Sequence, residues 1–137
     1  MMDQILFQKE IFIPSTIDGL NRCLDVIEEL KEQFDLNFDT MFCLHTVLVE
    51  AVENAFIHGN KGIRELDVRV FFSISLNEIF VEVEDRGEGF DMDTISSPTD
   101  YLNLKREGGR GIFFIKKLSA GCCTDGKGNI IRIKLNR

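Results

Sequence analysis

The sequence predicts an α/β fold, a two-layer sandwich in which a mixed, mainly antiparallel sheet carries helices on one face. Two observations predict it. In two long segments near the N-terminus, apolar residues recur at steps of three and four, as in amphipathic helices. In residues 67–76 and 79–84 they alternate with polar residues, as in half-buried strands. No repeat or low-complexity tract interrupts the 137 residues, so we expect one domain over residues 1–137.

The first two elements are expected before residue 35. Residues 5–13 are rich in strand-forming residues and stop at Pro14, which favours a strand. Ser15 or Thr16 can cap a helix that runs to about Phe34. Its expected buried face consists of Ile17, Leu20, Leu24, Ile27 and Leu30.

A second helix is expected from Asp39 or Thr40 to near Gly59. Its expected buried stripe consists of Leu44, Val47, Leu48, Ala51 and Ala55. The two alternating segments that follow are separated by the polar pair Asn77-Glu78, which predicts a hairpin. One face of the sheet is then apolar, and we expect the helices to cover it.

The remaining chain combines an irregular segment with a helix and a hairpin. Residues 86–107 show no sustained period, and a loop of this length inside a compact domain is more often functional than accidental. A third helix is expected from Gly111. Residues 120–124 and 129–135 then predict a closing hairpin with its turn at 125–128.

Charge and hydropathy exclude some classes of protein. The net charge is −7, and no basic stripe is present that could displace counterions from a nucleic acid, so we expect no direct nucleic-acid binding. No apolar run approaches the ~18 residues of a membrane span. The N-terminus lacks the apolar core and basic flank of a signal peptide. We therefore expect a cytoplasmic protein outside the membrane.

Three short segments carry the candidate chemistry, and the first is on the second helix. Glu50 and Asn54 are four residues apart and project from the same side, and His58 continues the row. A carboxylate can accept a proton from a hydroxyl or water, and an amide oxygen is a good hard ligand for Mg²⁺. The alternative is a solvated polar stripe on an amphipathic helix. Glu53 lies off the row and is expected at the surface.

The other two segments contain glycine. Asp85 ends an alternating strand, where its carboxylate can accept a hydrogen bond from an exocyclic amino group, and Gly87 and Gly89 let the main chain approach a flat ring. The alternative is a simple turn after an edge strand. The third segment opens the last predicted helix with Gly108, Gly109 and Gly111. Exposed amides and the positive end of a helix dipole suit phosphates there, and a flexible hinge is the alternative.

In this order, the segments resemble the asparagine box and the two glycine boxes of the GHKL ATPase superfamily. That superfamily includes gyrase, a heat-shock chaperone, histidine kinases and mismatch-repair ATPases. The resemblance is closest to its small single-domain branch, the anti-sigma factor serine-protein kinases. It covers about residues 5 to 135, and it implies a Bergerat ATP-binding fold with an ATP·Mg²⁺ site.

The resemblance also implies roles for single residues. By position, Glu50 would be the general base for an incoming serine hydroxyl, Asn54 the Mg²⁺ ligand, and Asp85 the acceptor for the adenine amino group. Residues 90–107 would form an ATP lid that closes over the nucleotide. The other nucleotide contacts it implies are His58, Gly59, Gly87, Gly89, Gly108, Gly109 and Gly111.

Two positions depart from the pattern of the family. Relatives usually begin the last strand with Gly-Thr, whereas this chain has Gly128-Asn129. Relatives also place an arginine in the lid shortly before the second glycine box, where this chain has Glu107. The nearby basic residues that can substitute for it are Lys105, Arg106 and Arg110.

For function, the resemblance implies an ATP-dependent serine-protein kinase that phosphorylates a STAS-type anti-sigma antagonist and sequesters a sigma factor, as a homodimer. A regulatory module that binds ATP and captures a signalling partner without phosphoryl transfer is the alternative. A detached histidine-kinase catalytic domain fits less well, because no dimerising phosphoacceptor helix pair is present in the sequence. A non-nucleotide α/β domain is the remaining interpretation.

Overall fold

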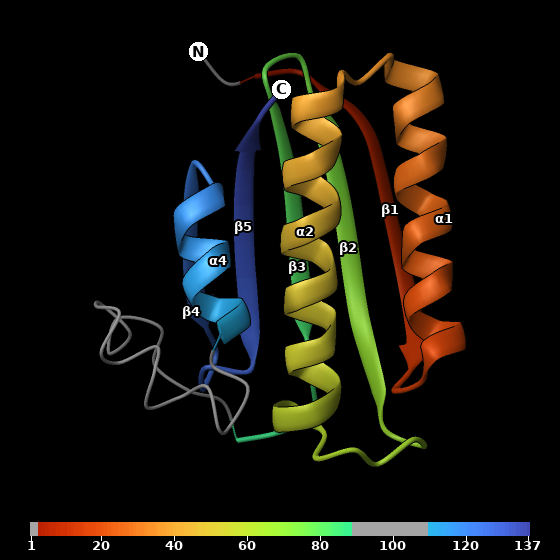
Figure 1. The fold of residues 1–137 in the computed structure, drawn as a ribbon, viewed down its shortest axis with the longest axis vertical. Coiled ribbons are helices and arrows are strands. Elements are labelled where there is room, and N and C mark those ends of the chain that lie inside the picture. Colours follow the sequence, from red (N-terminus) through yellow and green to blue (C-terminus); the bar gives the residue numbers. More distant parts are fainter. Residues whose placement is uncertain (1–2, 89–109) are drawn as a thin grey trace.

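The computed structural model describes residues 3–88 and 110–137. These residues form a five-stranded sheet and three α-helices, and the helices lie together on one face of the sheet (Figure 1). The strands are β1 (Ile5–Pro14), β2 (Asp67–Ser75), β3 (Glu78–Glu84), β4 (Gly121–Asp125) and β5 (Ile130–Asn136). The helices are α1 (Ile17–Phe34), α2 (Phe38–Asn54) and α4 (Arg110–Leu118), and a π-helical segment, η1 (Ala55–Gly59), continues α2. The predicted α/β sandwich is confirmed.

The sheet has the strand order β1-β2-β3-β5-β4. Both predicted hairpins are present, β2 with β3 and β4 with β5. A mixed sheet was expected, but all four pairings among the described strands are antiparallel. The reason is that the closing hairpin inserts β5 beside β3 in the antiparallel sense, so no described strand has a parallel neighbour.

Helix α1 begins as predicted and buries Leu20, Ile27 and Leu30 of its predicted face, but the centre of its buried stripe is rotated away from Ile17. The side chain of Thr16 caps it by accepting a hydrogen bond from the Gly19 N–H at 3.2 Å. Ile17 was expected in the core but is 71% exposed. At about 100° per residue, Ile17 lies about 100° around the helix from a buried stripe centred on Cys23 and Ile27. The predicted face was therefore rotated too far toward Ile17.

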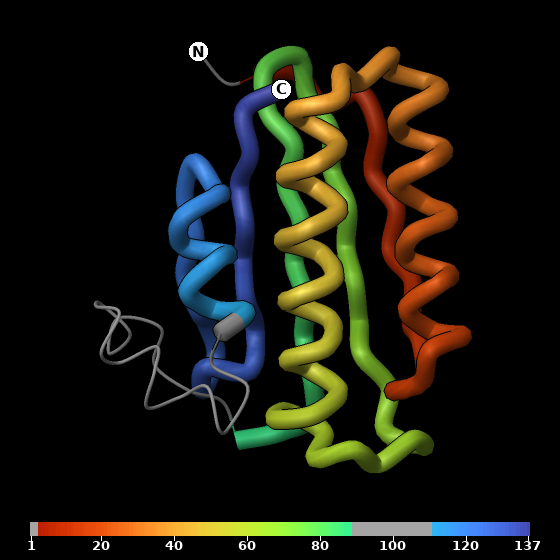
Figure 2. The backbone as a smooth tube through the Cα atoms, viewed as in Figure 1, coloured from red at the N-terminus to blue at the C-terminus, as the bar shows by residue number. Residues whose placement is uncertain are grey.

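Helix α2 is the central helix and packs between α1 and α4 (Figure 2). It begins at Phe38, one residue before the predicted start, because the Asn37 side chain caps it by accepting from the Thr40 N–H at 2.8 Å. The predicted stripe from Leu44 to Ala55 is buried.

Residues 38–59 have the length and mean hydropathy (1.3) of a membrane-spanning helix. The same criterion also selects core helices of proteins outside the membrane, and here the segment lies against the sheet.

The sheet face opposite the helices carries an ion-pair network that reaches all five strands. Arg69 on β2 and Arg132 on β5 both bind Glu82 on β3. Arg69 also pairs with Glu10 and Glu84, and Arg132 also pairs with Asp125. Burial alone would raise the pKa of Glu82, but the hydrogen bonds and charges of Arg132 and Arg69 outweigh it and hold that pKa below its usual value.

The candidate residues gather at one end of the sandwich. Segment η1, the turn that follows β3 and the start of α4 all lie at this end, whereas the loop between β2 and β3 and the C-terminus lie at the opposite end (Figure 2). Residues that are distant in sequence, such as Glu50, Asp85 and Gly111, are thereby brought to one end of α2.

Candidate functional site

Glu50 lies against the first turn of α4. An added Cβ on Gly111 would overlap the Oε2 atom of Glu50 and come within 3.1 Å of its Cβ. A larger residue at position 111 would therefore have to push the Glu50 carboxylate aside for α4 to approach α2 this closely. Two of the predicted segments, the one on α2 and the one that opens α4, meet at this contact.

Asp85 follows β3 directly and is buried, with 8% of its surface exposed. Its Oδ1 atom accepts a hydrogen bond from the Gly87 N–H at 2.6 Å. Burial raises the pKa of Asp85, and the charge of Glu84 acts in the same direction, while the Gly87 bond and the charge of Lys127 oppose it. Removing a charged carboxylate from water lowers the stability of the fold, and such destabilising buried charges are typical of functional sites.

Gly59 and Gly87 allow the first and second segments to touch. An added Cβ on Gly59 would overlap Cγ and Oδ2 of Asp85, and one on Gly87 would overlap the Gly59 carbonyl. The end of η1 and the turn after β3 therefore pack main chain to main chain. The Asp85 carboxylate lies directly at this junction.

The predicted row on α2 is interrupted at its end. Asn54 ends the α-helical part and is half-buried, whereas His58 lies in the π-helical turn and is exposed. A π-helical turn contains more residues than an α-helical one, so it shifts the direction in which His58 projects relative to Glu50 and Asn54. Glu53 is exposed, as expected from its position off the row.

Two asparagines hold the Asp85 turn, and the sequence analysis gave neither of them this role. Asn60 is 1% exposed and accepts a hydrogen bond from the Arg86 N–H at 2.8 Å. Asn129 donates from Nδ2 to the Asp85 carbonyl at 2.9 Å. Asn60 lies two residues after His58, and Asn129 stands where the chain departs from the family pattern. The sequence contains no signal that identifies Arg86 and Asp85 as their partners.

The chain matches the histidine kinase-like ATPase domain over residues 13–135. It belongs to the histidine kinase-like ATPase family. Its relatives include serine-protein kinase RsbW of Staphylococcus aureus, 34% identical in strain JH9 and 32% in strain MSSA476, each over 116 residues. RsbW of Oceanobacillus iheyensis is 24% identical over 115 residues. All three alignments cover 80% of this chain and 73% of the relative, and the resemblance to the anti-sigma kinase branch of the GHKL superfamily is confirmed.

Membership of this ATPase family implies the use of ATP, and the donor groups present fit a nucleotide-held magnesium ion. In residues 3–88 and 110–137, no group of three or more His, Cys, Asp or Glu side chains could hold a metal alone. Mg²⁺ usually keeps several waters and takes one or two protein ligands together with substrate phosphates. A single half-buried amide such as that of Asn54 matches this mode of binding.

Part of the predicted site in this ATPase lies outside the described residues. The lid at 90–107 is among them, together with Gly89, Lys105, Arg106, Gly108 and Gly109. Arg110 is the first residue of α4. The described part of the site is therefore the Glu50–Gly59 segment, the Asp85–Gly87 turn and the start of α4.

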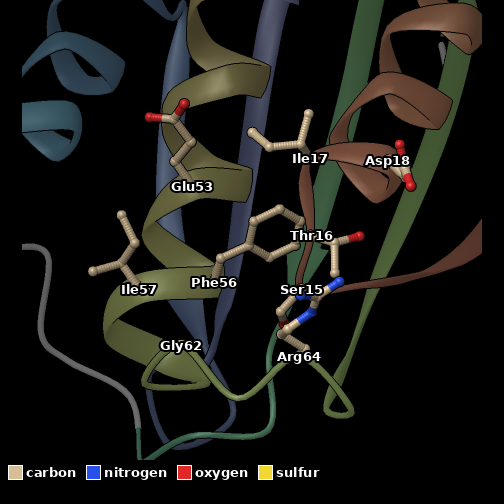
Figure 3. Close-up of a pocket in the computed structure, with 9 residues that line it drawn as sticks. All are labelled: Ser15, Thr16, Ile17, Asp18, Glu53, Phe56, Ile57, Gly62 and Arg64. Carbon is tan, nitrogen blue, oxygen red and sulfur yellow. The ribbon is translucent and has the colours of Figure 1, made fainter.

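A groove of about 560 Å³ lies beside η1 and the start of α1. Its lining is formed by Ser15, Thr16, Ile17, Asp18, Glu53, Phe56, Ile57, Gly62 and Arg64 (Figure 3). None of these nine residues is among the predicted nucleotide contacts. The exposed Ile17 contributes to this groove.

Proposed function

We propose that this chain is an ATP-dependent serine-protein kinase that phosphorylates a STAS-type anti-sigma antagonist and sequesters a sigma factor. The observation that supports the proposal is the mutual packing of the three motif segments, Gly59 against Asp85 and Gly111 against Glu50. The relatives in Staphylococcus aureus and Oceanobacillus iheyensis, whose printed name is serine-protein kinase RsbW, agree with it.

In the proposed mechanism, Glu50 accepts the proton of the attacking serine hydroxyl, Asn54 binds Mg²⁺ and Asp85 accepts a hydrogen bond from the adenine amino group. A bound Mg²⁺ neutralises phosphate charge, and the protein otherwise contributes positioning. Gly59 and Gly87 let η1 and the turn after β3 pack closely enough to hold the Asp85 carboxylate at their junction, because a Cβ at either position would overlap Asp85 or the Gly59 carbonyl. The remaining proposed contacts are His58, Gly89, Lys105, Arg106, Gly108, Gly109, Arg110 and Gly111.

The same proposal covers the domain, the cellular location and the oligomeric state of the protein. We take residues 1–137 as one kinase domain in the cytoplasm, with a lid at 90–107, and we expect a homodimer. Helices α1, α2 and α4 all lie on one face of the sheet (Figure 1), so no described helix covers the opposite face, where we propose that a second chain can pack. Light scattering of the purified protein would measure the mass of the assembly.

A regulatory module that binds ATP and captures its partner without phosphoryl transfer is the second candidate. Glu107 favours it, because an acidic residue stands where relatives have a basic one that can meet the γ-phosphate. The two candidates share the nucleotide pocket and differ only in chemistry.

Two experiments test these functions. Calorimetric titration of ATP, ADP and GTP, with and without Mg²⁺, tests the pocket, and no binding under any condition would contradict both candidates. Incubation with labelled ATP and a STAS-type partner tests transfer. Transfer that is lost in Glu50→Ala and kept in Glu53→Ala supports the kinase, because Glu53 is exposed one residue off the row. Tight partner binding without transfer supports the module.

A further inference from the structure

Two side-chain amides hold a single peptide unit at the candidate site. The peptide that joins Asp85 to Arg86 has one carbonyl and one N–H. Its carbonyl accepts a hydrogen bond from Nδ2 of Asn129 at 2.9 Å, and its N–H donates to Oδ1 of Asn60 at 2.8 Å. In a trans peptide these two groups point in opposite directions. The plane of this peptide is therefore fixed from both sides.

Asn60 is itself firmly anchored. It is 1% exposed, and its Nδ2 atom lies 3.1 Å from Ser15 Oγ, 3.0 Å from the Asp67 carbonyl and 3.3 Å from the Leu66 carbonyl. Its own N–H donates to the Ala55 carbonyl at 2.8 Å. Because these partners on Nδ2 are acceptors, the amide group is oriented with Oδ1 toward Arg86. Asn60 thus links the end of η1 to the turn after β3.

Asn129 anchors the other side through the sheet. Besides its side-chain bond, its main-chain carbonyl accepts from the Asp85 N–H at 3.0 Å. Asn129 directly precedes β5, which pairs with β3 along its whole length. The residue thus ties Asp85 to the rigid centre of the sheet.

We propose that Asn60 and Asn129 are positioning residues that set the base specificity of the site by fixing the direction of the Asp85 carboxylate. The inference rests on the proposed ATP-binding function. Adenine presents an amino group where guanine presents a carbonyl oxygen. A carboxylate held in place accepts from the amino group and repels the carbonyl oxygen, whereas a carboxylate that can turn away discriminates less.

Small movements of this peptide are sufficient for such an effect. Hydrogen bonds weaken steeply as their angle departs from linearity, and functional groups need positioning to about 0.5 Å and 10–20°. Among the described residues, the Asp85 carboxylate accepts only the Gly87 hydrogen bond, on Oδ1. Its orientation therefore depends on the main chain, and the two asparagines set the main chain.

The test compares five variants with the wild-type chain. Asn60→Ala and Asn129→Ala each remove one of the two bonds. Ser15→Ala is the first control, since it removes a partner of Asn60 Nδ2 and leaves the Arg86 bond. Asn77→Ala is the second, since the amide of Asn77 contacts Asp3 and Asn77 belongs to the loop between β2 and β3, at the opposite end of the sandwich. Calorimetry measures ATP, ADP and GTP affinities, and thermal melts measure the folded fraction.

Asn60→Ala and Asn129→Ala are each expected to lower the affinities for ATP and for ADP by the same factor, because both nucleotides carry adenine. The ratio of ATP to GTP affinity is expected to fall by about 10-fold or more. Ser15→Ala and Asn77→Ala are expected to keep the wild-type ratio. A merely structural role would lower the active fraction and leave this ratio unchanged. Asn129→Thr replaces the amide donor with a hydroxyl that can still donate a hydrogen bond, so it is expected to retain part of the selectivity.

Amide hydrogen exchange measures the positioning without nucleotide. The Arg86 N–H is expected to exchange at least about 10-fold faster in Asn60→Ala, while amides in the centre of β3 keep their protection. Unchanged Arg86 exchange, or equal changes in ATP and GTP affinity, would overturn the positioning role. A wild-type chain that binds no nucleotide would instead overturn the proposed function, and the Arg86 exchange would still report on the Asn60 bond.

Discussion

The carboxylate of Glu50 lies against the α-carbon of Gly111, although the two residues belong to different helices. A side chain at position 111 would have to displace this carboxylate. The contact also fixes the distance between α2, which carries the proposed general base, and the start of α4, where phosphates are proposed to bind. Substitutions at Gly111 therefore test both packing and chemistry.

Gly111→Ala is expected to lower the free energy of unfolding by about 1–3 kcal/mol, because its Cβ must displace Glu50 or shift α4. Phosphoryl transfer is expected to fall more than ATP affinity, since Glu50 is the group displaced. Denaturant titration and labelled-ATP transfer measure the two effects.

Gly121→Ala is the matched control, because the nearest atom to its Cβ would be the end of the Lys134 side chain at 3.7 Å. It should leave stability and transfer nearly unchanged. The loss in Gly111→Ala should also be smaller when Glu50 is already alanine. An equal loss in both backgrounds would show that the overlap with Glu50 is not the cause.

Asp85→Asn is expected to weaken ATP binding by about 1–3 kcal/mol. The Gly87 N–H already donates to Oδ1, so the amide of the variant would turn its NH₂ group toward the adenine amino group. Both groups are hydrogen-bond donors, so no bond can form between them. Calorimetry with ATP and GTP measures the change. Unaltered affinity for both nucleotides would remove Asp85 from the adenine site.

The same substitution is expected to stabilise the protein without nucleotide at pH 7. Burial raises the folded-state pKa of Asp85, so the folded protein holds this proton more tightly than the unfolded chain. Stability is then lost as pH rises from the unfolded value, about 3.9, through the raised folded value. Asp85→Asn should melt above wild type at pH 7, and the difference should vanish below about pH 3.9.

Glu82→Gln is expected to cost about 1–2 kcal/mol of stability at pH 7, because it weakens the bonds to Arg69 and Arg132. The folded pKa of Glu82 is lowered. Its contribution is therefore present above the unfolded value, about 4.3, and is lost as pH falls through the folded one. Urea titrations across this range measure the loss.

Glu78→Gln provides the comparison on the same strand. Glu78 pairs with Lys134 at 3.9 Å, and both side chains are about half exposed, so its loss should cost at most about 0.5 kcal/mol. If Glu78→Gln and Glu82→Gln lower the free energy of unfolding equally, the ion-pair network around Glu82 stabilises the protein no more than a single surface pair does.

Asn54→Ala is expected to reduce the gain in ATP affinity that Mg²⁺ provides, while leaving the melting temperature close to that of wild type, because the side chain is only half-buried. Calorimetry with and without Mg²⁺ measures this gain. If Mg²⁺ enhances ATP binding equally in the variant, Asn54 does not hold the metal.

The elements of the fold could be predicted from the sequence because each depends on local pattern. Strict alternation in β2 and β3 and the stripe on α2 fixed these segments to within one or two residues. The orientation of α1 could not be predicted equally well. Cys23 and Val26 complete its buried stripe. The prediction included Ile17 in the buried face instead of these two residues, because Ile17 is strongly apolar.

The site was less predictable because its contacts are non-local. Motif order identified Glu50, Asn54 and Asp85 as candidates, but the sequence contains no signal that pairs Asn60 with Arg86 or Asn129 with Asp85. Those pairs depend on how η1 and β5 meet the turn after β3. The π-helical turn at 55–59 was also not predicted, because the apolar stripe on the helix was expected to continue unbroken to near Gly59.

The position of β5 has a consequence for synthesis. This strand is the last described element in the chain, yet it lies inside the sheet between β3 and β4. While the chain emerges from the ribosome, β3 keeps one unpaired edge, and Asp85 lacks its Asn129 partner until residue 136 is free to pair. Nascent chains should therefore form the bonds between Asp85 and Asn129 only after β5 has emerged and paired with β3. Chains cut short before β5 would expose a strand edge prone to aggregation.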